Sequence, residues 1–287
     1  MNAIEKNPLK RLKLLNRLSL DNYISLIGKT TYKKSEIKEH SKLIKTYFKD
    51  MIRAKGEMKK LYKHSEASDK GRLYGSDSIQ ALDAIIRGYL FRGYTTDIDQ
   101  VNSHPVLLRY ISKKHKIRCP ILDEYVKNRT TILEDLKKEG IEDPKVLILK
   151  IVNSSQSPRK YKSLFIKSLI SEVKAIRDSL REIIEYQQLF EEAKTVKPLN
   201  VMGSFINRIL CYYENEVLQV MINFLNKKQY EIACLSFDGL LIYSDEYNNP
   251  SLITELEKEI NDKFDGMEMR LKYKEHSNII TDDFLES

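Results

Sequence analysis

The sequence is poor in residues that break or cross-link a chain. It has 10 glycines and 7 prolines among 287 residues, no internal repeat and no low-complexity tract. Its three cysteines, Cys119, Cys211 and Cys234, are far apart and form no Cys-x-x-Cys pair. These features argue against a disulfide framework and a cysteine-based zinc site, and they favour a reducing compartment. The scarcity of glycine and proline also predicts one continuous architecture without a flexible linker.

Long hydrophobic runs are missing as well. The longest apolar stretch, residues 234–243, is far shorter than the ~20 residues that cross a bilayer as a helix, and a charged turn interrupts it. The N-terminal segment has no small-residue cleavage site. We therefore expect neither membrane insertion nor secretion, but a cytoplasmic protein, or one of the host nucleoplasm if the source is viral.

Basic residues exceed acidic ones by 49 to 41, which gives a net charge of +8. Residues 1–72 contain long Lys/Arg-rich stretches with Tyr and Phe set between the charges. Such a region suits a nucleic-acid backbone, and the 17 tyrosines permit base stacking in a chain without tryptophan. Solvated faces of ordinary surface helices explain the charge pattern equally well.

The spacing of apolar residues predicts a mainly helical α+β fold with a small antiparallel sheet. Strand character is confined to residues 90–98, 230–237, 240–243 and 267–273. The predicted helices lie near residues 34–62, 78–90, 104–115, 121–139, 144–153, 159–194, 203–228 and 249–264.

Three aspartates lie at the ends of the predicted strands. Asp97 and Asp99 close the first strand, and Asp238 lies in a hairpin whose expected two-residue turn is Asp238-Gly239. Strand-end aspartates from distant segments can hold two Mg²⁺ ions, which serve phosphoryl transfer. Taken alone, an Asp-Gly pair is more often simply a turn.

Further elements around Asp97 follow one another in a fixed order between Lys70 and Ser112. They are Gly71-Arg72-Leu73, Ser76-Asp77, Ile79-Gln80, Ile86-Arg87 and Asp97. This order resembles family A nucleic-acid polymerases, in which the last element is the aspartate of motif A. The resemblance covers about residues 70–275 and implies a palm sheet with catalytic aspartates, reduced fingers and a small helical thumb.

Within motif A, the resemblance makes Asp97 a metal ligand and Asp99 a second ligand or an alternative register. Gln100 and Asn102 then belong to the nucleotide site. Asn102 stands where the family has a glutamate that gates the ribose 2′-hydroxyl, so the sugar preference is open. In motif C only Asp238 matches, because Phe237 and Gly239 replace the flanking histidine and acid.

The resemblance also assigns the charged residues around these motifs. Lys145 and Lys150 would meet the triphosphate, and Lys150 would assist the leaving pyrophosphate; a solvated helix face is the alternative for both. Beyond Asn153 the expected Tyr-Gly is absent, and residues 154–156 are Ser, Ser and Gln. Arg72, Gln80 and His104 would contact nucleic acid, with structural roles as the alternative. Glu214, on the helix ahead of the hairpin, is expected on a charged helix surface, with a position facing the active site as the alternative.

The predicted organisation has four parts. Residues 1–69 form a basic, helical, thumb-like region, 70–118 the palm with motif A, 119–200 reduced helical fingers, and 201–287 the palm with the motif C hairpin and a C-terminal β-α-β unit.

The predicted function is template-directed nucleotidyl transfer with two Mg²⁺ ions, for which Mn²⁺ can substitute. A DNA-directed DNA polymerase of a virus or mobile element is preferred. Its expected partners are a DNA primer–template or template strand, nucleoside triphosphates, and processivity, replication or transcription proteins, with no membrane. The alternatives are a primase-like enzyme or RNA polymerase, and a non-catalytic replication or transcription accessory with a decayed palm.

Overall fold

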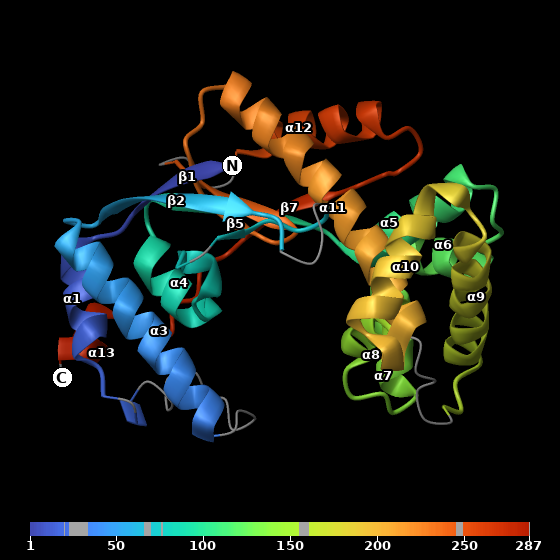
Figure 1. Cartoon of the computed structure of the whole chain (residues 1–287), viewed down its shortest axis with the longest axis horizontal. Helices are drawn as coiled ribbons and strands as arrows, with labels where there is room; N and C mark the ends of the chain where they lie inside the picture. Colours follow the sequence, from blue (N-terminus) through green and yellow to red (C-terminus); the bar gives the residue numbers. More distant parts are fainter. Residues whose placement is uncertain are drawn as a thin grey trace.

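The structure is a computed structural model that describes residues 1–19, 21–22, 34–65, 70–75, 77–154, 161–244 and 249–286. It is mainly helical with two small antiparallel sheets, which confirms the predicted α+β class (Figure 1). Ser76, Ser155 and Gln156 from the motif comparison lie outside the described residues. No helix in the described ranges is both long and apolar enough to cross a membrane.

The larger sheet joins segments that are far apart in the sequence. Its strand order is β5-β6-β4-β7, and all neighbours are antiparallel. The strands are β4 (Thr95–Gln100), β5 (Ile232–Ser236), β6 (Gly239–Tyr243) and β7 (Leu271–Lys274). Asp97 pairs with Leu241 and Lys274, and Asp99 pairs with Gly239. The central strand β4 therefore carries both acids of motif A beside the hairpin that carries Asp238.

The β5–β6 hairpin turns at Phe237-Asp238, so the predicted Asp238-Gly239 turn is wrong by one residue. Phe237 has a left-handed backbone with φ +59°, and Gly239 is the first residue of β6. A Cβ atom on Gly239 would lie 2.5 Å from the carbonyl oxygen of Ile98 and would collide with Oδ1 of Asp99. The close approach of β4 requires glycine at this position. The Asp-Gly pattern therefore predicted the hairpin correctly but placed its turn one residue too late.

A second sheet near the N-terminus was not expected. It consists of β1 (Asn2–Lys6), β2 (Glu57–Lys63) and β3 (Tyr74–Gly75), in that order. The helix predicted for residues 34–62 ends at Arg53, because Lys55 and Gly56 both take left-handed backbone conformations and turn the chain into β2. The lysines of β2 resemble a charged helix face in sequence, although Lys60 and Tyr62 alternate with exposed residues as in a strand.

Helices cover both faces of the larger sheet. Ile98, Leu240 and Ile242 pack into a core with α11 and α12, whereas Cys234 and Leu241 pack into a core with α1, α3 and α4. Figure 1 shows these two groups on opposite sides of the strands. The helices concerned are α1 (Leu9–Arg17), α3 (Lys34–Arg53), α4 (Ala84–Phe91), α11 (Val201–Lys227) and α12 (Pro250–Lys263).

The helices between residues 103 and 196, which follow β4 in the chain, form a group on the right of the view (Figure 1). Two of the predicted helices are each divided in two: the chain turns at Asn128 and again between residues 182 and 186. The helices are α5 (Ser103–Lys114), α6 (Pro120–Lys127), α7 (Arg129–Lys138), α8 (Pro144–Asn153), α9 (Leu164–Arg181) and α10 (Gln187–Val196). The short elements are η1 (Ile79–Ala81), η2 (Ile184–Tyr186), η3 (Pro198–Asn200) and α13 (Asp282–Glu286).

A buried glutamate ties the N-terminal strand to its surroundings. Glu5 of β1 is fully buried and accepts hydrogen bonds from the Tyr47 hydroxyl at 2.9 Å and from the backbone N–H of Ile79 at 3.0 Å. Burial raises the pKa of Glu5 to about 7, against the opposing effect of these hydrogen bonds and the charge of Lys60. The carboxyl thus connects β1, α3 and η1, but its charged form is held at a cost in free energy.

We expect Glu5→Gln to stabilise the protein at pH 8 and to give no gain at pH 5. The pKa of Glu5 is about 4.5 in the unfolded chain and about 7 in the folded protein. The folded protein therefore loses stability as the pH rises through this range, because ionisation of the buried carboxyl is unfavourable. Removing the charge should increase the free energy of unfolding by about 1–2 kcal/mol at pH 8. Urea unfolding at both pH values measures this, with the exposed Glu57→Gln on β2 as control; a loss of stability at pH 8 would contradict the assignment.

Candidate active site

Three carboxylates meet where β4 ends beside the β5–β6 turn. Asp97 and Asp99 alternate with Ile98 and therefore lie on the same face of β4. Oδ1 of Asp97 is buried and has no hydrogen-bond partner among the described residues. Oδ2 of Asp99 lies 2.9 Å from the Nζ of Lys274 on β7. The structure thus brings together the three aspartates that the sequence predicts.

The acids disfavour one another's ionisation. Burial and then the charge of Asp99 raise the pKa of Asp97 to about 7, and Lys274 offsets only part of this effect. Burial, followed by the charges of Glu214 and Asp99, raises the pKa of Asp238 to about 6. Clustered, desolvated carboxylates of this kind are relieved by a bound cation, and Mg²⁺ prefers oxygen ligands. Lys274 acts on both acids of β4, and the adjacent cavity is lined by Asp99 and Asp238 but not by Asp97, so all three aspartates are candidate ligands.

A cavity of about 480 Å³ opens beside these acids. Asp99 and Asp238 line one part of it, and four cationic side chains contribute to the rest of the wall. The cations are Arg72, Arg129, Lys145 and Lys272. A cavity with carboxylates beside several cations can hold a metal-bound polyphosphate, because each charge on such a ligand then meets an opposite one.

The two lysines of α8 lie apart. Lys145 lines the cavity with Leu149 and Asn153, which follow at intervals of four residues on one face of the helix. Lys150 is exposed and lines a separate hollow with Tyr161 and Lys162. Lys145 and Lys150 are five positions apart, which separates them by about 140° around an α-helix. Only one of the two lysines can therefore face the acids. The structure therefore does not bring Lys150, predicted to be catalytic, to this site.

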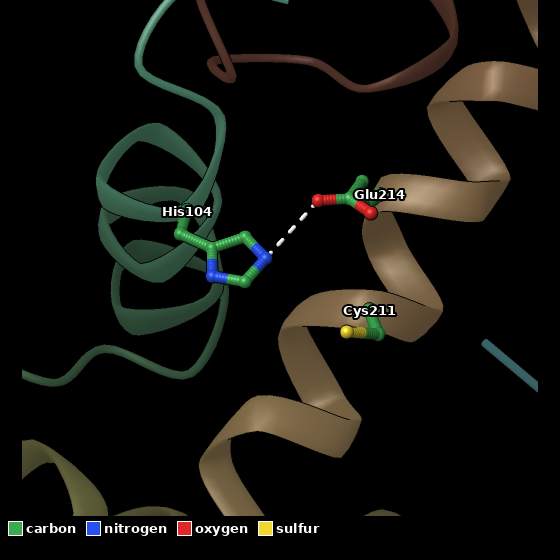
Figure 2. A group of neighbouring side chains, drawn as sticks. All are labelled: His104, Cys211 and Glu214. Atoms are coloured by element: carbon green, nitrogen blue, oxygen red, sulfur yellow. Dashed lines mark ion pairs between the residues drawn. The ribbon is translucent and has the colours of Figure 1, made fainter. Parts of the chain in front are cut away.

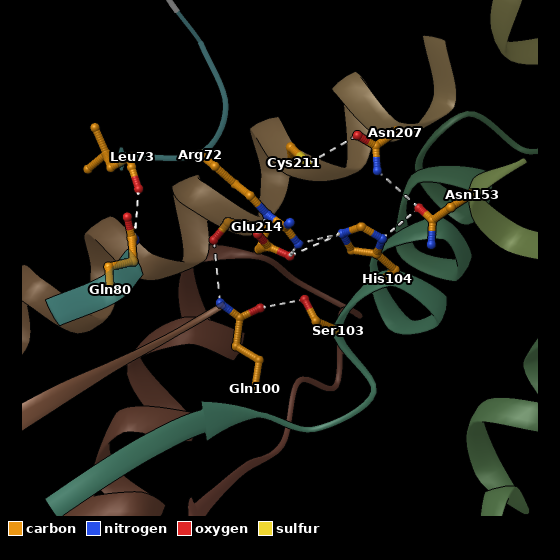
Figure 3. A network of polar contacts seen from close by, with 10 residues as sticks. All are labelled: Arg72, Leu73, Gln80, Gln100, Ser103, His104, Asn153, Asn207, Cys211 and Glu214. Atoms are coloured by element: carbon orange, nitrogen blue, oxygen red, sulfur yellow. Dashed lines mark hydrogen bonds and ion pairs between the residues drawn. The ribbon is translucent and has the colours of Figure 1, made fainter. Parts of the chain in front are cut away.

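Arg72, His104 and Glu214 form a charged network at the edge of the cavity (Figure 3). Glu214 is only 1% exposed; Nη2 of Arg72 lies 2.9 Å from its Oε2, and Nε2 of His104 lies 3.0 Å from the same oxygen. Nε of Arg72 donates to Oε1. Burial opposes the charge of Glu214, but hydrogen bonds from Arg72 and His104 hold its pKa below the usual value.

Glu214 lies at the site, which was the less favoured of its two expected positions; the charged helix surface expected for it is wrong, because its side chain is buried. The available signal was its place between apolar neighbours on α11, since Tyr213, Val217 and Leu218 are also buried. Arg72, predicted to contact nucleic acid, is engaged by Glu214 and also lies over the ring of Phe237, 5.3 Å from its centroid. Its remaining exposure faces the cavity and a neighbouring hollow.

The two predicted glutamines have different environments. Gln80 is 6% exposed; its side chain accepts from the N–H of Gly75 at 3.0 Å and donates to the carbonyl of Leu73 at 3.1 Å. Both ends of the Gln80 amide are thus used in hydrogen bonds to the backbone of residues 73 and 75, and Gln80 does not line the cavity. Gln100 does line the cavity, where its Oε1 accepts from Ser103 Oγ at 2.8 Å.

Asn102 has an unusual conformation in the cavity wall. It precedes α5 with a left-handed backbone, φ +57°. Its Oδ1 accepts a hydrogen bond from the Tyr125 hydroxyl at 3.3 Å, while its buried Nδ2 finds no acceptor in the described part of the chain. The cavity wall therefore contains a buried amide donor whose hydrogen bond is unsatisfied within the described residues.

One further group has the composition of a transition-metal site. The ligand atoms of His104, Cys211 and Glu214 all lie within 4.8 Å of one another (Figure 2). However, Arg72 holds both oxygens of Glu214, and a guanidinium beside the group repels a cation. This group is therefore a poorer cation site than the strand-end aspartates.

Similarity to known proteins is found both in a viral sequence and among solved structures. No protein-family model matches this chain. Protein V13 of the Sputnik virophage, whose name gives it as an inferred helicase, is 30% identical over 241 residues, covering 76% of this chain and 31% of V13. This chain therefore spans about a third of the length of that relative. Among solved structures, the POL domain of Pol1 from M. smegmatis in complex with DNA primer-template and dNTP matches with a TM-score of 0.43, at 11% identity, over 95% of this chain and 67% of that chain.

We expect Asp97→Asn to stabilise the fold at pH 8 in the absence of divalent cations. The raised pKa of Asp97 means that stability falls as pH rises from about 4 through about 7, and the amide removes that loss. A gain of about 1–2 kcal/mol at pH 8 should disappear at pH 4.5. Thermal unfolding at both pH values tests this, with the exposed Asp265→Asn as control; destabilisation at pH 8 would contradict the analysis.

With divalent cations present, we expect the wild type to gain stability relative to Asp97→Asn. We expect millimolar Mg²⁺ or Mn²⁺ to raise the melting temperature of the wild type by a few degrees, because an ion that binds only the folded state stabilises it. Asp97→Asn and Asp238→Asn should lose the response, whereas Asp265→Asn should keep it. An equal response in all four proteins would show that the ions bind elsewhere.

Proposed function

We propose that this chain is a template-directed nucleotidyltransferase and, more specifically, a DNA-directed DNA polymerase. The observation that carries the proposal is the meeting of Asp97, Asp99 and Asp238 at the end of β4, beside a cavity with several cations. Enzymes that join nucleotides need this combination, because the transition state concentrates negative charge that must be held between metal ions and cationic side chains.

The residues divide the work by position. Asp97 and Asp238 would hold two Mg²⁺ ions, which supply an activated 3′-hydroxyl and neutralise charge on the leaving pyrophosphate. Asp99 would be oriented by Lys274 toward the same ions or nucleotide. Lys145 and Arg129, which also line the cavity, would bind the triphosphate. In this proposal Lys145 takes the role that the sequence analysis gave to Lys150.

Nucleic acid would approach along surfaces outside the cavity. Tyr74 is 46% exposed and makes an edge contact with Phe237, the residue before Asp238. A half-exposed aromatic pair beside the catalytic acids suits a stacking contact with the terminal base pair. The basic N-terminal region, including α1 and α3, would contact backbone phosphates in the manner of a thumb.

A ribonucleotide-using, primase-like activity is the second candidate, and Asn102 favours it. Asn102 lines the cavity, and an amide side chain there can hydrogen-bond a ribose 2′-hydroxyl, which a deoxyribose lacks. The comparison of dNTPs with NTPs therefore separates the two forms of the proposal. A viral or mobile-element source remains part of the proposal, and the V13 relative supports it, being encoded by a virophage.

The helicase name of V13 does not enter the proposal. This chain spans 31% of V13, so the named activity need not belong to the shared part. The sequence of this chain contains Gly28-Lys29-Thr30 but has Tyr23 where the phosphate-binding loop of many helicases needs its first glycine. We therefore place nucleotidyl transfer, rather than ATP-driven unwinding, in this chain.

Primer extension tests the proposed activity directly. A labelled primer on DNA and RNA templates is incubated with dNTPs or NTPs and Mg²⁺, and unprimed reactions are included. We expect template-dependent extension by the wild type and a loss of at least about a thousandfold in Asp97→Ala and Asp238→Ala, since each removes a ligand of the metal ions. Asp265→Ala serves as the matched aspartate control and should retain activity.

The outcomes separate the alternatives. Extension only with NTPs, or synthesis without a primer, would favour the primase-like enzyme. Primer–template binding without incorporation under any pairing would overturn the proposed catalysis and favour the non-catalytic accessory. Extension that survives both alanine substitutions would show that the catalytic centre lies elsewhere.

A further inference from the structure

We infer that His104 is a positioning residue: its doubly protonated imidazolium fastens the cavity face of α8 to the palm. The inference rests on the proposed function for its consequence, since the face in question carries Lys145. Its structural basis is independent of that function and lies in the hydrogen bonds around the ring (Figure 3).

The partners of His104 fix its protonation state. Nδ1 lies 2.7 Å from Oδ1 of Asn153, the last residue of α8. The amide orientation of Asn153 is determined by its own contacts, because its Nδ2 donates to the carbonyl of Leu149 at 3.0 Å and its Oδ1 accepts from Asn207 Nδ2 at 3.3 Å. Oδ1 is therefore an acceptor, and Nδ1 of His104 must carry a proton.

The contact of the other ring nitrogen, Nε2, also requires a proton on that nitrogen. Nε2 lies 3.0 Å from Oε2 of Glu214, an ionised carboxylate that can only accept hydrogen bonds. A neutral imidazole has a single N–H and can satisfy either Glu214 or Asn153, but not both. Only the imidazolium joins α11 and α8 through one ring.

The carboxylate of Glu214 favours the imidazolium, whereas the nearby guanidinium of Arg72 opposes it. Glu214 and Cys211 face the ring from α11, Arg72 faces it from the segment before β3 with Nη2 at 3.5 Å, and α8 contributes the uncharged Asn153. Burial alone would lower the pKa of His104, but its hydrogen bonds with Cys211 and Glu214 raise it to about 9. The ring is 8% exposed, so solvent does not replace a lost partner easily.

The consequence for the site follows from the geometry of α8. Asn153, Leu149 and Lys145 share the face that lines the cavity, so a tether at Asn153 sets the direction in which Lys145 points. Arg177 of α9 also holds α8, through the carbonyl of Ile151, but it does so from outside this face. Loss of the His104 proton would release one of the two links, to Asn153 or to Glu214, and loosen α8 against the acids.

The structural part is tested on the full chain without nucleotide. The five histidines are labelled with ¹⁵N, and the resonances lost in His104→Gln identify those of His104. We expect His104 to have both nitrogens protonated at pH 7.5 and to titrate near pH 9. Amide hydrogen exchange in α8 should accelerate in His104→Gln and in Asn153→Ala, and in the wild type above pH 9 after correction for the intrinsic rate.

The functional part uses the dissociation constant of a complementary dNTP on a dideoxy-terminated primer–template with Mg²⁺. At pH 7.5, His104→Gln and Asn153→Ala should bind the dNTP about tenfold more weakly, which corresponds to the loss of one hydrogen bond to a charged group. His104→Arg keeps the positive charge at every pH and offers several donors, so it should retain affinity at pH 9.5 where the wild type loses it. His115→Gln is the control. His115 follows the last residue of α5, the helix that carries His104, and its ring is hydrogen-bonded to the Tyr186 hydroxyl.

Each failure has a separate meaning. Titration of His104 near pH 6.5, or unchanged exchange in α8 of both variants, would overturn the inference whether or not the chain is a polymerase. Normal titration and exchange results with no dNTP binding by the wild type would instead contradict the proposed function. Circular dichroism of each variant distinguishes local loosening from unfolding, and unfolding of His104→Gln leaves Asn153→Ala as the decisive comparison.

Discussion

The pairing of β4 with β6 is the constraint on which the rest of the structure depends. It places Asp99 opposite Gly239 and brings Asp97 and Asp99 beside the turn that carries Asp238. The pairing requires a residue without a side chain at position 239, because the Ile98 carbonyl and the Asp99 carboxylate occupy the space of a Cβ atom. The same close approach that completes the sheet therefore brings together carboxylates that repel one another, and a cation would relieve that repulsion.

A buried ionic network extends this arrangement beyond the sheet. Glu214 of α11 receives Arg72 and His104, and His104 in turn reaches Asn153 of α8. Two cations and one carboxylate inside the protein are stable only while each remains paired, so displacement of one member carries a large cost. The network thus gives the wall that carries Lys145 a defined position relative to the aspartates, and the proposed catalysis needs that precision.

The sequence was informative where chemistry and local pattern coincide. The α+β class, the strands of the larger sheet and the proximity of Asp97 to Asp238 follow from apolar periodicity and strand-end acids. The N-terminal sheet could not be predicted, since the lysines of β2 mimic a charged helix face and Lys60 is buried only by tertiary contacts. Lys145 and Lys150 have equal propensities and differ only in helical phase, and the burial of Glu214 depends on partners 142 and 110 residues away in the sequence.

The central claim is that the strand-end aspartates, rather than the His104, Cys211 and Glu214 group, bind the catalytic metal ions. The most direct measurement is an anomalous difference map from crystals grown with Mn²⁺, a dideoxy-terminated primer–template and a complementary dNTP. The account predicts Mn²⁺ peaks between the carboxylates of Asp97 and Asp238, next to the triphosphate. A peak at His104, Cys211 and Glu214 with none at the aspartates would contradict it.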